Sequence, residues 1–198
     1  FSDIDKVPNL SVNINKWIYT ELIEAKSKIE KNLEDYRFDE AAKNAYQFAW
    51  HSYCDWYLEL SKTILFSDNE EAKTEVRKVS SYVFKQILIL LHPFIPFVTE
   101  EIWLNNKFDK SGKDFLMHAN WPTGEINKDT STEQVENIIS IISEIRSFKN
   151  ELNVGPGSFI DMSINNINEN QKKFINENEI ILKKLGRINN ILNDDLNK

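Results

Sequence analysis

The sequence has few of the residues that interrupt or cross-link a chain. It contains five glycines, five prolines and one cysteine in 198 residues, and the lone Cys54 cannot form an internal disulfide. No apolar run approaches the roughly 20 residues that span a bilayer, and the first residues are too polar for a signal peptide. These absences predict a cytoplasmic protein with a reduced thiol and no membrane segment.

The sequence also has fewer cationic than anionic residues. Lysine and arginine number 24 against 31 aspartates and glutamates, which gives a formal net charge of -7. A protein held to nucleic acid by bulk positive charge is excluded, because such binding needs many cations to neutralise phosphates. Any contact with nucleic acid must therefore be local.

Motifs that would mark a catalytic or metal site are missing as well. The sequence has no C-x-x-C pair, no haem-attachment motif, no glycine-rich phosphate loop and no dinucleotide-binding fingerprint. Di-iron bundles place a glutamate three residues before a histidine, whereas Phe48, Ile89 and Phe115 stand at those positions before the three histidines. We therefore predict no metal ligands, no cofactor and no catalytic residues in this chain.

Cys54 is the one residue that could act as a nucleophile. His51 lies three residues before it, a spacing at which the two side chains of a helix can touch. A cysteine among Tyr53, Trp56 and Tyr57 is more typical of a buried apolar position, so we predict a structural role for Cys54.

Helical periodicity is what the sequence does contain. Apolar residues recur at spacings of three and four in three long segments, residues 14–33, 38–64 and 72–90. In the middle segment this spacing predicts an inward row that includes Ser52 and Trp56. The segment is aromatic on more than one face, and its rings outside that row must either meet further helices or face a partner. The pattern predicts a mainly α fold that begins with an antiparallel helical bundle.

Two prolines end the third segment. Pro93 and Pro96 lack a backbone N–H and disfavour helical geometry at the preceding residue, so the chain must turn there before a further short helix. We expect the turn to bring Phe94, Phe97 and Trp103 onto the end of the bundle, with Trp103 buried.

The C-terminal third has the pattern of a small α+β extension. A helix and a Gly-Pro-Gly turn precede residues 158–164, which alternate in polarity as in a strand. A helix near residues 171–185 and a short strand at 187–192 complete the unit.

Apolar density dips between these two patterns, and we expect the domain boundary there. The predicted domains are residues 1–125 for the bundle and 126–198 for the extension. Because the chain begins with Phe1 and a linker-like segment, we expect it to be a piece of a longer protein.

Several stretches resemble a known family. Residues 36–42, together with residues 54–62, are similar to the anticodon-binding helical bundle of valyl-tRNA synthetases. Residues 91–103 resemble the same domain in the valyl, leucyl and isoleucyl enzymes. Residues 144–146 and 153–157 look like the join between the bundle and a small extension in that family. The resemblance covers nearly the whole chain.

The resemblance implies a parent enzyme that activates valine with ATP and esterifies it to its tRNA, as a class I aminoacyl-tRNA synthetase. It also implies a catalytic domain in the same polypeptide with HIGH-like and KMSKS-like motifs, neither of which occurs here. The chain itself is then expected to bind valine tRNA, to hold no ATP and to be inactive alone.

Binding of this kind has a known physical basis. Sequence-specific RNA binding uses unpaired bases, which stack on aromatic rings or arginine planes and hydrogen-bond through their exposed edges. An anticodon loop offers such bases. We predict a set of cations around the aromatic helix, with aromatic platforms near them, as the nucleic-acid-binding residues: Trp17, Arg37, Tyr57, Lys62, Lys73, Arg77 and Lys78.

Two alternatives stay open. A helical scaffold that binds protein through its aromatic helix would also have an acidic, aromatic-rich surface. The same domain of an isoleucyl or leucyl enzyme is disfavoured by residues 54–59, Cys-Asp-Trp-Tyr-Leu-Glu, which point to the valine member. Salt dependence separates an RNA binder from a protein scaffold, because phosphate contacts weaken as salt rises.

Overall fold

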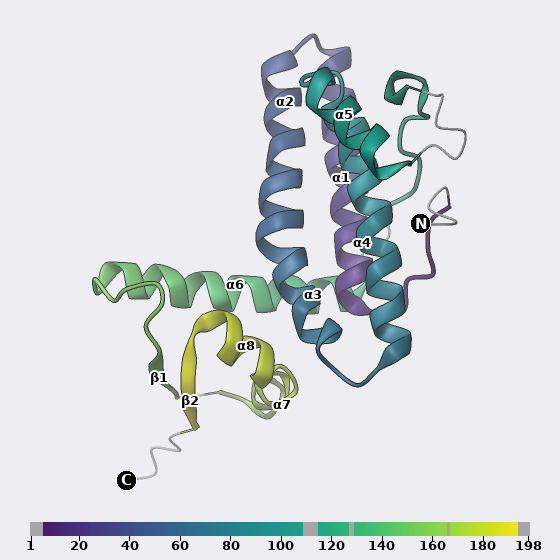
Figure 1. Cartoon of the computed structure of the whole chain (residues 1–198). Coiled ribbons are helices and arrows are strands. Elements are labelled where there is room, and N and C mark those ends of the chain that lie inside the picture. The colour runs from purple at the N-terminus through teal and green to yellow at the C-terminus, as the bar shows by residue number, and fades with distance from the viewer. Residues whose placement is uncertain (1–5, 109–114, 127–128, 166, 194–198) are drawn as a thin grey trace. The chain divides into compact units, whose positions relative to one another are not determined.

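The computed structural model describes residues 6–108, 115–126, 129–165 and 167–193 (Figure 1). The chain divides into two compact units, Phe1–Thr132 and Glu133–Lys198, and the dividing point falls in the first turn of α6 (Thr130–Glu151). Within the described ranges, no helix combines the length and the apolar character of a bilayer-spanning segment.

The first unit is a helical bundle. α1 (Asn13–Glu34) ends at a turn, after which α2 (Phe38–Gln47), η1 (Phe48–Tyr57) and α3 (Leu58–Leu65) follow one another as a continuous rod. α4 (Glu70–Leu91) returns in contact with both α1 and the rod, as Figure 1 shows. The predicted antiparallel bundle is confirmed.

Capping residues fix where α4 begins. The Asn69 side chain accepts a hydrogen bond from the Ala72 N–H at 3.0 Å, and Glu70 and Glu71 bring negative charge to the first turn. α1 differs, because its N-cap residue, Val12, has no side chain that can accept a hydrogen bond.

The middle of the rod, η1, is wound as a π-helix. An α-helical spacing predicts Ser52 and Trp56 in the inward row, but both are half-buried, and Tyr53 and Tyr57 are buried in their place. A π-helix bonds residue i to i+5, so each turn holds more residues and the inward row advances by one position. The prediction of the inward row is wrong at these positions for that reason.

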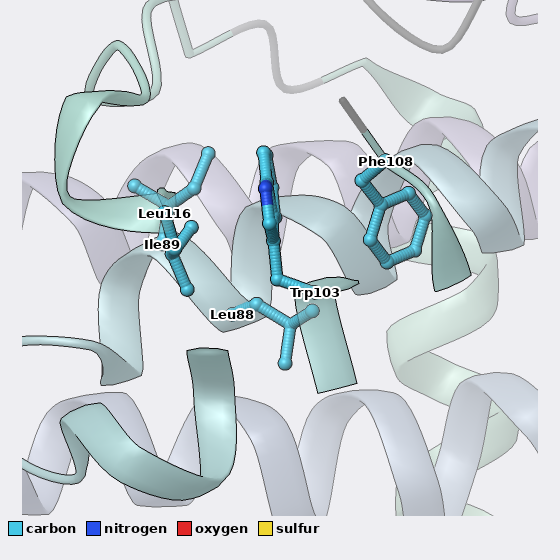
Figure 2. Packing of buried hydrophobic residues seen from close by; sticks show 5 residues of the cluster. All are labelled: Leu88, Ile89, Trp103, Phe108 and Leu116. Carbon is cyan, nitrogen blue, oxygen red and sulfur yellow. The ribbon is translucent and has the colours of Figure 1, made fainter. Parts of the chain in front are cut away.

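α5 (Pro96–Asn106) begins with Pro96 in its first turn, as the proline pair predicts, and η2 (Leu116–His118) follows it. Trp103 of α5 is 4% exposed, so its predicted burial is confirmed. Figure 2 shows it in a cluster of five buried side chains: Leu88, Ile89, Trp103, Phe108 and Leu116.

Phe97 does not join this cluster, and the expectation that it helps to close the bundle is wrong. Its side chain is 90% exposed. At 3.6 residues per turn, the spacing from Phe97 to Trp103 carries Phe97 about 120° around α5, away from the face that Trp103 buries.

The second unit is a small α+β extension, as predicted. After α6 come β1 (Ile160–Ile164), α7 (Glu169–Glu177), α8 (Glu179–Gly186) and β2 (Ile188–Asn193). β1 and β2 pair in parallel, with Ile160 opposite Ile188, so the helices between them form the crossover. The single helix predicted near residues 171–185 is two helices, because the backbone leaves helical geometry at Asn178 (φ -110°, ψ 10°).

Candidate nucleic-acid interface

Two of the seven predicted RNA-binding residues are buried. Trp17 is 3% exposed and Tyr57 is fully buried. The Tyr57 hydroxyl donates to Asn15 Oδ1 at 2.8 Å, and burial raises the pKa of Tyr57 above its ordinary value. The prediction that these two rings stack on bases is wrong, because a base cannot reach the face of an enclosed ring. Both are parts of the bundle core.

The five predicted cations fall into two groups. Arg37 lies at the α1–α2 turn, whereas Lys62, Lys73, Arg77 and Lys78 lie in the last turn of α3 and the first turns of α4. Figure 1 shows these two turns at opposite ends of the bundle. Most of the rod separates Arg37 from Lys62, roughly 35 Å at about 1.5 Å per residue. The structure therefore brings four of the cations to one end and leaves Arg37 apart.

We call this end, formed by residues 62–78, the α3–α4 end. Lys62 is paired with Glu59 at 2.5 Å and Lys73 with Glu70 at 2.7 Å, so their charges are partly neutralised. Arg77, by contrast, is exposed on the surface of α4.

An exposed ring stands at the same end. Phe66 follows the last residue of α3, its backbone N–H still donates to the Lys62 carbonyl at 3.2 Å, and its side chain is 80% exposed. Sequence reasoning missed this residue. One signal was available in the sequence. Phe66 stands between the last apolar residues of α3 and the polar link at 67–69, so it falls outside the apolar stripe of the helix and can be exposed.

An open hollow adjoins these residues. It is formed by the N-terminal segment at residues 6–12 together with the first turns of α4, and both Lys6 and Lys78 line it. Glu70, Glu71 and Glu75 line it as well, so the wall carries both lysines and carboxylates.

Glu75 holds the N-terminal segment against α4. Its carboxylate accepts hydrogen bonds from the backbone N–H groups of Ser11 and Val12, each at 2.9 Å, from the Ser11 hydroxyl, and from Asn15 Nδ2 at 2.9 Å. The bond from Val12 pairs one of the N–H groups that α1 leaves without an intrahelical partner, and the others hold the segment before α1. Desolvation acts to raise the pKa of Glu75, but the bonds from Asn15, Ser11 and Val12 outweigh it and lower the pKa below its usual value.

A second exposed surface follows the α1–α2 turn, α2 and η1. We call it the α2 aromatic face; its rings are between 52% and 81% exposed, and they belong to Tyr36, Phe38, Tyr46 and Trp50. Tyr36 and Phe38 meet edge to face, and the rings of Tyr46 and Trp50 are parallel with their centroids 6.3 Å apart.

The charges beside the α2 aromatic face are mostly negative. Asp35, Asp39 and Glu40 flank its first two rings in the sequence. Arg37 and Lys43 approach the same carboxylate, Glu40, at 3.8 and 3.7 Å. An RNA phosphate would find little uncompensated positive charge here.

Cys54 is exposed, which corrects the expectation that it is buried. The π winding turns Tyr53 and Tyr57 inward, so their neighbour faces outward. His51 Nδ1 lies 3.1 Å from Asp55 Oδ2. Partial desolvation and the negative charge of Asp55 raise the pKa of the Cys54 thiol. A protonated thiol is a poor nucleophile. Throughout the described ranges, no group of three or more His, Cys, Asp or Glu side chains could hold a metal ion.

Comparisons with known proteins show which family the sequence resembles. The family model described as the anticodon-binding domain of tRNA ligase matches residues 15–164. The chain is 76% identical over all of its 198 residues to a valine–tRNA ligase of Pelagibacter ubique (strain HTCC1062), of which it covers 23%. It is 38% identical over 184 residues, 91% of the chain, to a valine–tRNA ligase of Rhizobium meliloti (strain 1021), of which it covers 19%. The chain thus spans about a fifth of the length of these curated relatives.

Proposed function

Because the chain belongs to the family of anticodon-binding domains of tRNA ligases, we propose that it binds the anticodon arm of a valine tRNA as one part of a valine–tRNA ligase. The valine assignment follows the names of the relatives, which match along nearly the whole chain. It also agrees with the sequence at residues 54–59, which resembles the valyl enzymes.

The parent enzyme would activate valine with ATP and transfer it to the tRNA in the cytoplasm. ATP and the reacting groups would then be held by a catalytic domain elsewhere in the same polypeptide. This chain would recognise the tRNA. It would bind and orient the tRNA, and the catalytic domain would carry out the reaction.

One observation carries the proposed location of the RNA site. At the α3–α4 end, an 80% exposed Phe66 shares one end of the bundle with the exposed Arg77 and with Lys78, which lines the adjoining hollow. A splayed base can stack on the ring or on the guanidinium plane, and the cations can contact its phosphates. Stacking contributes on the order of 1 to 3 kcal/mol per base, which allows a few local contacts to act against the acidic average of the surface.

The α2 aromatic face supports a second role, contact with protein. Its four exposed rings lie beside carboxylates rather than free cations, and aromatic residues are enriched in protein interfaces. A protein partner could sit there while RNA occupies the α3–α4 end. On this view Trp50→Ala leaves tRNA affinity unchanged.

The test is binding of the chain to transcripts of a valine tRNA and of the same tRNA with its anticodon exchanged, by fluorescence anisotropy. We expect a clear preference for the valine anticodon. Phe66→Ala, and the double variant Arg77→Ala with Lys78→Ala, should each weaken binding by about tenfold. Equal affinity for the two transcripts would contradict the proposed function.

Arg37→Ala is the matched control, since it removes a cation from the other end of the bundle. We expect it to change affinity by less than about twofold, as for a residue outside the interface. A larger loss for Arg37→Ala than for the Arg77 and Lys78 variant would move the site to the α1–α2 end.

A further inference from the structure

Arg187 occupies a backbone conformation that its residue type disfavours. It follows Gly186, the last residue of α8, with φ 55° and ψ 57°. The left-handed residue after a helix is most often glycine, because a side chain at that position is strained. Here an arginine stands where a glycine would relieve the strain, and such a strained position can mark a side chain with a role.

The arginine side chain lies over an aromatic ring. Its guanidinium carbon is 5.6 Å from the centroid of the Phe159 ring, which is 53% exposed, and Arg187 itself is exposed. The backbone fixes the two side by side, because the Ile160 N–H donates to the Arg187 carbonyl at 3.0 Å where the two parallel strands begin. The pair therefore stands at one defined edge of the extension.

Two side chains of α6 hold the backbone beside this pair. Lys149 is only 4% exposed, and its Nζ donates to the Ser158 carbonyl at 2.5 Å, directly before Phe159. The Arg146 guanidinium donates to the Leu185 carbonyl at 3.3 Å, two residues before Arg187. These two bonds fix the chain on both sides of the Arg187–Phe159 pair.

We propose that Phe159 and Arg187 form a second RNA contact, in the extension, on which an unpaired nucleotide stacks. The inference rests on the proposed function for the identity of the RNA, a tRNA. Bases stack on aromatic rings and on guanidinium planes, and here the Arg187 guanidinium lies over the exposed Phe159 ring. Arg187 also supplies a positive charge that can approach a phosphate.

The experiment measures the affinity of the whole chain for a labelled valine tRNA transcript by fluorescence anisotropy at one fixed salt concentration. Arg187→Gly removes the plane and the charge while relieving the backbone strain, and Phe159→Ala removes the ring. Each should weaken binding by about fivefold or more. Circular dichroism verifies that both variants stay folded.

Asn153→Gly is the matched control. Asn153 also has a left-handed backbone in the extension (φ 53°), so the change relieves similar strain and removes neither a cation nor a ring. It should leave affinity within about twofold of the wild type. Arg187→Lys keeps the charge but loses the plane, and it should behave like Arg187→Gly. Affinity of Arg187→Gly or Arg187→Lys equal to that of the control would overturn the proposal.

The same variants are measured on the transcript with the exchanged anticodon, which separates this inference from the proposed function. An equal penalty on both transcripts without any anticodon preference would refute the anticodon role and support the contact at Arg187. A clear anticodon preference with no penalty for Arg187→Gly would refute the contact and leave the anticodon role standing.

Discussion

Trp103 is a large buried ring whose removal should strongly reduce stability. It is 4% exposed, its ring lies 5.5 Å from that of Phe108, and Lys85 Nζ sits 5.1 Å from its centroid. Trp103→Ala should lower the free energy of unfolding by about 3 to 5 kcal/mol, through lost burial and the cavity left behind. Urea denaturation followed by circular dichroism measures the change.

Trp50→Ala is the control for this residue, because Trp50 is 52% exposed on the α2 aromatic face. We expect it to cost less than about 1 kcal/mol, as for a surface substitution. If Trp103→Ala also lost less than about 1 kcal/mol, the ring would not be part of the core in solution.

Among the secondary-structure elements, α1 and α4 depend on one carboxylate. Glu75 of α4 accepts hydrogen bonds from the start of α1, and Asn15 links it to the buried Tyr57 hydroxyl. Glu75→Gln should lower the free energy of unfolding at pH 7 by about 1.5 to 3 kcal/mol, the range for hydrogen bonds to a charged group. Glu71→Gln, an exposed neighbour on the same helix, should have little effect.

The effect of Glu75 should depend on pH in a definite direction. Its pKa is lower in the folded chain than the ordinary value of 4.5, so the unfolded chain binds the proton more readily. The stabilisation is therefore complete above the unfolded pKa and is lost as the pH falls through the folded pKa. Denaturation curves at several pH values should show the wild type and Glu75→Gln converging on the acid side. A constant difference between them would contradict this assignment.

For the whole molecule, the acidic surface makes salt dependence informative. With a net charge of -7, the chain has no general attraction for RNA, and its affinity must come from a few local contacts. Three phosphate contacts predict that log K falls with log salt concentration at a slope of roughly -2 to -3. Anisotropy titrations at several salt concentrations measure the slope, which removal of Arg77 and Lys78 should reduce by about 1 to 2. A slope near zero would favour a protein scaffold.

The sequence alone was sufficient for the large elements. Apolar side chains at three- and four-residue spacing bury one face of each long helix wherever it packs, so the bundle follows from the pattern. Pro93 and Pro96 act through their own covalent geometry, and the turn before α5 needs no tertiary information. Trp103 was predictable as a core residue because burying a large aromatic ring is strongly favourable, and the turn places this ring against the bundle.

The tertiary structure decided which side chains are available to RNA. The π winding of η1 shifts the inward row by one position, so Tyr53 and Tyr57 are enclosed. Tyr46 and Trp50 are exposed on another side of the rod. The length of the rod separates Arg37 from the cations of α3 and α4, although all of them flank one aromatic helix in the sequence. The end of α3 exposes Phe66, and the pairing of β1 with β2 brings Arg187 beside Phe159. Exposure and proximity depend on how distant segments pack, and a one-dimensional pattern of residue types does not contain that information.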